Sequence, residues 1–180
     1  MSSEIADINS FWRLAGPLKW FKKDVAFDAD ICVQFFEAHE SAARGELSGW
    51  LDHPEGALAL LILLDQFPRN LFRGSAHAFA TDAMALSAAR FALRYGHDAH
   101  CGVEMKQFFY MPFMHSENIA DQELCLALCR AHGLKDNIEF AEIHRDIIRR
   151  FGRFPHRNPV MGRVTTQEEK AFLDAGGFAG

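Results

Sequence analysis

Six arginines stand between residues 145 and 163, together with one acid, Asp146, and no lysine. This stretch carries a formal charge of +5, although the whole 180-residue chain carries −5. A guanidinium presents a planar set of N–H donors that matches carboxylates and phosphates, and it also packs on phenylalanine rings. The alternation of Arg and Phe around Gly152 and Pro155 therefore favours an anion-binding site.

The same arginines could equally be used inside the protein. Acids elsewhere in the chain could pair with them, namely Asp65, Asp82 and Glu117. Clustered charges with perturbed pKa values are found at functional sites and in structural ion-pair networks alike. The residues alone leave both interpretations open.

A second charged segment follows the most apolar part of the chain. Asp65 comes directly after eight consecutive apolar residues, 57–64, so we expect it to be buried or half-buried. An isolated buried carboxylate is very costly, and it must therefore be paired or hydrogen-bonded. Arg69 and Arg73 are the nearest candidate partners for Asp65.

A third segment places His115, Ser116 and Glu117 at the start of a predicted helix, with Asp121 one turn after Glu117. A histidine beside two carboxylates could hold a divalent metal or act in acid–base chemistry. Ser116 and Glu117 are equally well explained as a helix cap and an acid that offsets the helix dipole. Because no His-x-x-x-His or His-Glu-x-x-His spacing is present, the sequence predicts no metal site.

Apolar residues recur with helical spacing along most of the chain, and no convincing strand pattern is present. Pro, Gly and capping residues separate the helical stretches. We therefore predict one all-α domain over residues 1–180, a multi-helix array of about seven to nine helices. The apolar helix at 57–67 should be its centre, and Pro68 should end that helix. The expected helices are 5–15, 28–44, 57–67, 75–95, 116–132, 136–151 and 166–175.

The bulk composition limits the partners and the location that we expect. A net charge of −5 gives no general reason to expect nucleic-acid or membrane binding. The longest apolar run is far shorter than the roughly 18 residues of a membrane span. The four cysteines form no Cys-x-x-Cys pair, and the N-terminus has no signal-peptide pattern. The sequence thus predicts a reduced, cytoplasmic protein with no nucleic-acid and no membrane partner.

Four long motifs resemble the bacterial family called domain of unknown function 924. They are Leu-Leu-Asp-Gln-Phe-Pro-Arg-Asn-Leu-Phe-Arg-Gly at 63–74, Ala-Phe-Ala-Thr-Asp-Ala at 78–83, Phe-Tyr-Met-Pro-Phe-Met-His-Ser-Glu at 109–117 and Arg-Arg-Phe-Gly-Arg-Phe-Pro-His-Arg-Asn at 149–158. The resemblance implies a tetratricopeptide-like array of antiparallel helix hairpins, and it implies no assigned activity. The chain departs from the family at Arg13, which replaces an aromatic residue, and at Met114, which replaces a frequent Glu. The loss of that carboxylate weakens the case for a metal beside His115.

The leading hypothesis is that an arginine-lined groove between helices binds an anionic small molecule or a peptide terminus. The first alternative is a hydrolase-type enzyme with water as the nucleophile, and the second is a structural or protein-interaction module with internally paired arginines. The candidate ligand-binding residues are Arg69, Asn70, Arg73, Tyr110, Arg149, Arg153, His156, Arg157 and Asn158. The candidate catalytic residues are His115, Glu117, His156 and Asp65. We expect no cofactor and no metal, and the oligomeric state is not predicted.

Overall fold

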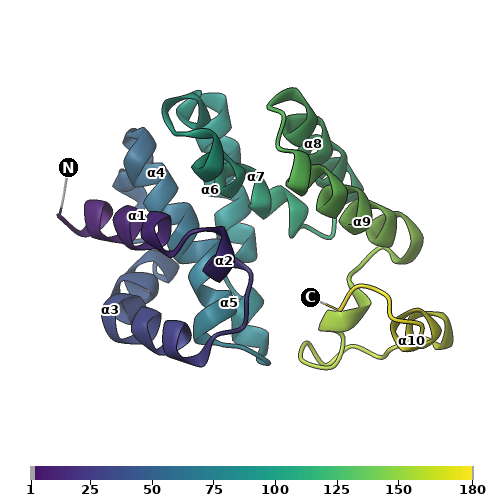
Figure 1. Cartoon of the computed structure of the whole chain (residues 1–180). Helices are drawn as coiled ribbons and strands as arrows, with labels where there is room; N and C mark the ends of the chain where they lie inside the picture. The colour runs from purple at the N-terminus through teal and green to yellow at the C-terminus, as the bar shows by residue number, and fades with distance from the viewer. Residues whose placement is uncertain (1–2, 180) are drawn as a thin grey trace. The chain divides into compact units, whose positions relative to one another are not determined.

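The computed structural model describes residues 3–179, and within this range it consists of helices and loops without a strand (Figure 1). The predicted all-α fold is therefore confirmed. A π-helical segment, Ile62–Gln66, joins α4 and α5 into one continuous helix, so nine separate α-helices lie in the described range. The tetratricopeptide-like arrangement stays a prediction. The helices are α1 (Ser3–Ala15), α2 (Pro17–Trp20), α3 (Val25–Ala43), α4 (Pro54–Leu61), α5 (Phe67–Leu71), α6 (Asp82–Arg94), α7 (Val103–Met114), α8 (Ile119–Ala131), α9 (Lys135–Phe151) and α10 (Gln167–Asp174).

Contacts within the chain divide it into two compact units. Unit 1 comprises the described residues up to 73 together with 77–112, and unit 2 comprises residues 74–76 and 113–179. Helices α1 to α6 and nearly all of α7 thus belong to unit 1, and α8 to α10 belong to unit 2. The prediction of a single domain over residues 1–180 stays a prediction.

The apolar stretch 57–64 lies at the centre of unit 1, as its composition predicts. All eight of its residues are buried, and α1, α3 and α6 contact the helix that contains them. Aromatic rings complete this core, because Trp12 meets both Phe67 and Phe108 edge to face at centroid distances of 5.5 and 5.7 Å. Such ring pairs contribute about 1 kcal/mol each beyond the area that they bury.

This helix does not end at Pro68, contrary to the sequence-based expectation. In a regular α-helix the ring of Pro68 would clash with the carbonyl group of Leu64. Here the N–H of Phe67 donates to the carbonyl of Ile62, five residues back, so the backbone widens directly before the proline. The helix therefore continues to Leu71.

Side chains bind two of the carbonyl groups in the π-helical segment. The hydroxyl of Thr81 donates to the Leu64 carbonyl oxygen at 2.6 Å, and Nδ1 of His39 lies 2.9 Å from the Leu63 carbonyl oxygen. Buried carbonyl groups need such partners, since an unpaired one costs about as much as a lost hydrogen bond. The widened turn is thus held in place, and it positions Asp65 and the arginines after it.

Gly56, in the first turn of α4, is required by a close approach of two backbone segments. A Cβ atom at this position would overlap the carbonyl oxygen of Trp50, and a backbone atom cannot move aside as a flexible side chain can. We expect Gly56→Ala to lower the free energy of unfolding by about 2 kcal/mol, a typical cost of overpacking. Urea denaturation measures this loss. Gly49→Ala is the control, because a Cβ atom there meets open space, and an equal loss in both variants would contradict the prediction.

Unit 2 is built on α8 and α9, which pack against each other and are joined by a short turn. His144, Ile147 and Ile148 are buried on one stripe of α9, as their spacing predicts. Gly152, with φ at +70°, ends α9 in the left-handed conformation that glycine adopts without steric cost. The chain then turns so that Phe154 packs beside Ile147 and Ile148. Three further rings surround this cluster, namely Phe151, Phe172 and Phe178.

Two helix starts differ from the expected positions in an informative way. Asp24 caps α3 by accepting the amide hydrogens of Ala26 and Phe27, whereas Asp28, the first residue of the expected helix 28–44, pairs with Arg73. The expected helix 75–95 is a 3-10 turn, Ala76–Phe79, followed by α6 from Asp82.

Among residues 3–179, none of the helices combines the length and the apolar character needed to cross a membrane.

Candidate functional site

The structure divides the candidate residues between the two units. The unit 1 candidates are Asp65, Arg69, Asn70, Arg73 and Tyr110. The unit 2 candidates are His115, Glu117, Arg149, Arg153, His156, Arg157 and Asn158.

Asp65 is buried, and Arg69 is its arginine neighbour, as expected. The side-chain amide of Gln66 donates to Oδ2 of Asp65, and Nη2 of Arg69 lies 3.9 Å from its Oδ1. The Arg69 guanidinium also donates to Oδ1 of Asp82 at 2.7 Å and to the carbonyl oxygen of Ala78. Arg69 is thus shared between two carboxylates of unit 1.

Arg73 and Asn70 meet on a different acid, Asp28. Nε and Nη2 of Arg73 donate to the two carboxylate oxygens of Asp28 at 2.6 and 2.9 Å, and the Asn70 amide donates at 2.7 Å. Burial alone would raise the pKa of Asp28, but the hydrogen bonds from Arg73 and Asn70 outweigh it and lower the pKa. Tyr110 donates its hydroxyl hydrogen to Asp98 at 2.7 Å. Each ligand-binding candidate of unit 1 therefore contacts an acid within that unit.

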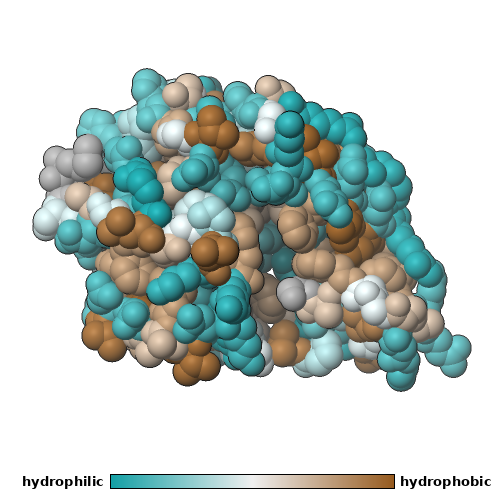
Figure 2. All heavy atoms as spheres, viewed as in Figure 1, coloured by the Kyte–Doolittle hydropathy of each residue, from teal (hydrophilic) through white to brown (hydrophobic). Residues whose placement is uncertain are grey.

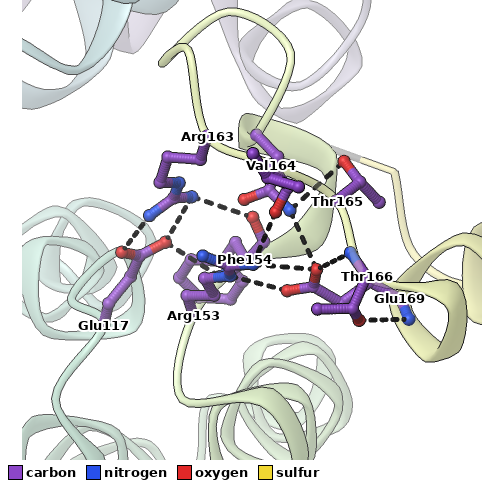
Figure 3. Close-up of polar contacts among 9 residues, drawn as sticks. Glu117, Arg153, Phe154, Arg163, Val164, Thr165, Thr166 and Glu169 are labelled. Atoms are coloured by element: carbon purple, nitrogen blue, oxygen red, sulfur yellow. Dashed lines mark hydrogen bonds and ion pairs between the residues drawn. The ribbon is translucent and has the colours of Figure 1, made fainter.

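Glu117 ties the loop after α9 to the start of α8 (Figure 3). Its two oxygens accept hydrogen bonds from Nη1 and Nη2 of Arg163 at 2.7 and 3.0 Å, and the amide of Phe154 donates to it at 2.8 Å. Burial raises the pKa of Glu117, but the bonds from Arg163 and the Phe154 amide outweigh this effect and lower it. Such a stabilised carboxylate is a weak general base, so the acid–base hypothesis gains little support from Glu117.

Glu169 is the second acid of this network (Figure 3). Nε and Nη2 of Arg153 donate to its two oxygens at 2.6 and 2.9 Å, and the amide of Asn158 donates at 3.2 Å. The backbone amide of Thr166 also donates to Glu169 at 2.7 Å, which completes a capping box at the start of α10. The hydrogen bond from Arg153 lowers the pKa of Glu169 to about 2. We call Glu117, Arg163, Arg153 and Glu169 the arginine–glutamate network.

Other arginines of this region form pairs on the surface. Arg149 pairs with Glu123, and Arg150 lies 2.9 Å from Glu168. All four side chains are exposed to solvent, so each pair contributes at most about 1 kcal/mol. These ion pairs fix little of the structure.

A hollow of about 290 Å³ lies beside α10 in unit 2. Arg150 and Arg153 line it together with their partners Glu168 and Glu169. Two guanidinium groups are thus balanced by two carboxylates, and an anionic ligand would have to displace a glutamate. The hollow therefore suits an anion less well than the number of arginines suggests.

Two histidines of unit 2, His144 and His156, pack against the same two phenylalanine rings, and Arg157 lies over one of these rings. The ring centroid of His144 lies 4.5 Å from that of Phe178 and 5.4 Å from that of Phe154. The ring centroid of His156 lies 5.5 and 5.7 Å from those of the same two rings. The guanidinium carbon of Arg157 lies 4.5 Å from the Phe154 centroid. We call these five residues the histidine–arginine cluster.

The pKa of His144 is lowered to about 4. Burial is the main cause, and the positive charges of His115, Arg157 and His156 add to it, whereas the hydrogen bond to the Phe140 carbonyl acts in the opposite direction. His115 thus lies close enough to act on the cluster. Because His144 and Arg157 are buried while His115 and His156 are half-buried, two imidazoles remain within reach of solvent.

Asn118, not Ser116, caps α8. The side chain of Asn118 accepts the amide hydrogen of Ala120 at 2.8 Å, whereas the hydroxyl of Ser116 donates to Asp121 at 2.8 Å. Asp121 is therefore engaged by the loop that precedes its helix. Among residues 3–179, no group of three or more His, Cys, Asp or Glu side chains is placed to hold a metal ion.

Sequence reasoning did not single out three residues that organise unit 2. Gln122, which is buried, donates to the carbonyl oxygens of Met114 and Ser116 at 2.7 and 2.6 Å and so fixes the loop before α8. Nothing in the sequence around Gln122 indicates this role. Arg163 belongs to the basic stretch, but its position in the sequence does not indicate its partner. The Thr-x-x-Glu pattern at 166–169 predicts the start of a helix, but it does not predict the ion pair of Glu169 with Arg153.

Comparisons with known proteins agree with the motifs. The family model described as a bacterial protein of unknown function, DUF924, matches residues 8–177. The solved structure of ATU0120, a protein of unknown function from Agrobacterium tumefaciens, is similar to this chain, with 50% sequence identity and a TM-score of 0.94. The matched region covers 97% of this chain and 98% of that protein. No curated protein matches the chain. The chain therefore belongs to the bacterial DUF924 family, to which no function has been assigned.

Proposed function

We propose that the chain binds an anionic small molecule or a peptide terminus at the histidine–arginine cluster of unit 2. The observation that carries this proposal is the packing of His144 and His156 on the same two rings, Phe154 and Phe178, with Arg157 over Phe154. Imidazolium and guanidinium groups recognise carboxylates and phosphates through charge-assisted hydrogen bonds. Aromatic rings behind these groups exclude water, which strengthens their attraction for an anion.

This proposal assigns anion binding to fewer residues than the arginine-lined groove predicted from the sequence. Arg153 and Arg163 are engaged by glutamates, and we assign the arginine–glutamate network a scaffolding role, because it holds the segment that carries His156 and Arg157. The ligand would contact His156 and His115 directly, and the buried charge of Arg157 would lie behind them.

We also place the protein in the cytoplasm. All four cysteines lie in the described range, where none of them forms a disulfide bond, and Cys32 is exposed. Disulfides form and persist in oxidising compartments, so reduced cysteines of this kind are typical of a cytoplasmic protein.

Isothermal titration with phosphate, a nucleotide, a dicarboxylate and an acidic peptide terminus tests the binding proposal. Because a protonated imidazole attracts anions, we expect at least one of them to bind at about pH 6 and to bind less tightly at about pH 8. His156→Gln should weaken this binding about tenfold or more, as expected when one hydrogen bond to a charged group is lost. Because His156 is only half-buried, the variant is expected to fold.

His132→Gln is the matched control, because it removes an exposed imidazole of the same unit. The histidine signals in NMR spectra give a second readout, since a bound anion raises the pKa of imidazoles that contact it. If no ligand of the panel binds at about pH 6, or if binding is unchanged by His156→Gln, the proposal is wrong.

A further inference from the structure

The most basic segment of unit 1 takes no part in the candidate site. Residues 8–23 contain four cationic residues and no acid, in a chain whose net charge is −5. Three of the six lysines of the whole chain fall within this short segment. The four cationic residues are Arg13, Lys19, Lys22 and Lys23, and all four are exposed.

Large apolar side chains are exposed along the same stretch of the chain, between residues 14 and 25. Leu14 and Leu18 are each 87% exposed, Val25 is 75% exposed and Phe21 is 59% exposed. Figure 2 shows separate hydrophobic side chains, in brown, among hydrophilic ones over the α1 to α3 part of unit 1. Single exposed apolar residues are ordinary, but four large ones within twelve positions indicate an interaction surface.

The backbone of this segment is anchored, so these side chains are held outward. Trp12 and Trp20 point into the core, and Nε1 of Trp20 donates to the carbonyl oxygen of Trp12 at 2.7 Å. The ring of Trp20 also meets Phe108 edge to face at a centroid distance of 4.9 Å. Because the inward positions are filled, Leu18 and Phe21 on either side remain at the surface.

The three lysines of this segment differ from Arg13, whose Nη2 lies 4.0 Å from Oε2 of Glu55. In the described part of the chain, no ion pair joins Lys19, Lys22 or Lys23 to a carboxylate, and the side chain of the adjacent Asp24 is used to cap α3. The ammonium group of Lys19 lies over the Phe27 ring, 5.3 Å from its centroid. Their charges therefore face solvent and are available to an anionic partner.

We propose that this surface, formed by Leu14, Leu18, Phe21 and Val25 with the four neighbouring cations, binds to an anionic lipid bilayer. Protruding single side chains separated by lysines suit a fluid interface, into which each can insert, better than a rigid protein surface of complementary shape. The lysines would lie at the level of the lipid phosphates. This proposal replaces the expectation, based on net charge, that the chain binds no membrane.

Co-sedimentation with vesicles tests the proposal with the full chain. We expect binding to phosphatidylcholine vesicles that contain about 30% phosphatidylserine, and much weaker binding to phosphatidylcholine alone. Each lysine near an anionic surface contributes a factor of about five in affinity. The triple variant Lys19→Gln, Lys22→Gln, Lys23→Gln should therefore bind about a hundredfold more weakly.

The apolar contribution is tested separately with Leu18→Ser and Phe21→Ser, which should weaken binding even at high salt, where electrostatic attraction is screened. Two controls match these changes. The triple variant Lys106→Gln, Lys135→Gln, Lys170→Gln alters the net charge equally, and Val164→Ser removes an equally exposed apolar side chain from unit 2. Thermal unfolding confirms that each variant is folded.

The proposal is wrong if the chain does not bind the vesicles that contain phosphatidylserine. It is also wrong if the two triple lysine variants lose equal amounts of affinity for these vesicles. Soluble polyglutamate distinguishes a lipid surface from an acidic protein. The lipid proposal is wrong if polyglutamate binds as tightly as the vesicles and if Leu18→Ser and Phe21→Ser leave both affinities unchanged. The partner would then be an acidic protein. Because these residues lie in unit 1, this outcome is independent of anion binding in unit 2.

Discussion

Glu169→Ala should lower the free energy of unfolding by about 2 to 3 kcal/mol. The side chain of Glu169 is only 3% exposed, and it accepts hydrogen bonds from Arg153, Asn158 and the Thr166 amide. Its removal breaks a largely buried ion pair and the capping box of α10 together. Urea denaturation followed by circular dichroism measures the loss.

The neighbouring acid provides a matched control for this variant. Glu168 also pairs with an arginine, but its side chain is 64% exposed, so Glu168→Ala should cost less than about 1 kcal/mol. Adding Arg153→Ala to Glu169→Ala should cost little more than Glu169→Ala alone, because the pair is already broken. Equal losses in the two glutamate variants would show that burial of Glu169 does not decide the stability of this region.

The sequence predicted features that depend on local composition. Eight apolar residues in a row can only be buried, and the carboxylate of Asp65 directly after them must then find partners, as it does in Gln66 and Arg69. The spacing of His144 with Ile147 and Ile148 places it on the apolar stripe of α9, a position typical of a core residue. It is buried, and its Nδ1 lies 2.7 Å from the Phe140 carbonyl oxygen.

Helix α7 could not be predicted, because it lacks the amphipathic pattern on which the prediction rests. Phe108, Phe109, Tyr110 and Phe113 are all buried, so polar residues do not mark an outer face in this part of the helix. Pro112 inside the helix further suggests a break. A helix that is buried on all sides leaves only a continuous apolar run, which is indistinguishable from a short strand.

The partners of the arginines could not be predicted either. Arg73 pairs with Asp28, 45 positions away, and Arg163 pairs with Glu117, 46 positions away. Nearer acids compete for each arginine in the sequence, and only the packing of the helices decides between them. The basic stretch indicates that anions lie near its arginines, but the identity of those anions is a property of the fold.

The stability of the protein should fall by about 2 kcal/mol between about pH 7 and about pH 5 because of His144 alone. The pKa of His144 is lowered to about 4 in the folded protein, from 6.5 for an unperturbed histidine. The unfolded chain therefore takes up a proton at His144 as the pH falls through about 6.5, while the folded protein does so only near pH 4. The contribution of His144 to the stability of the protein is thus present above about pH 6.5 and is lost progressively as the pH falls to about 4.

His144→Phe separates this effect from the other titrating groups, because a phenyl ring can keep the contacts with Phe154 and Phe178 but cannot take up a proton. The readout is the slope of unfolding free energy against pH, so a constant loss from imperfect packing does not matter. The glutamates with lowered pKa values, Glu117 and Glu169, lose their stabilisation only below about pH 4.5, outside this window. His132→Gln, which removes an exposed imidazole, should keep the wild-type slope. If His144→Phe keeps it too, the imidazole of His144 is not buried as a neutral group in the folded protein.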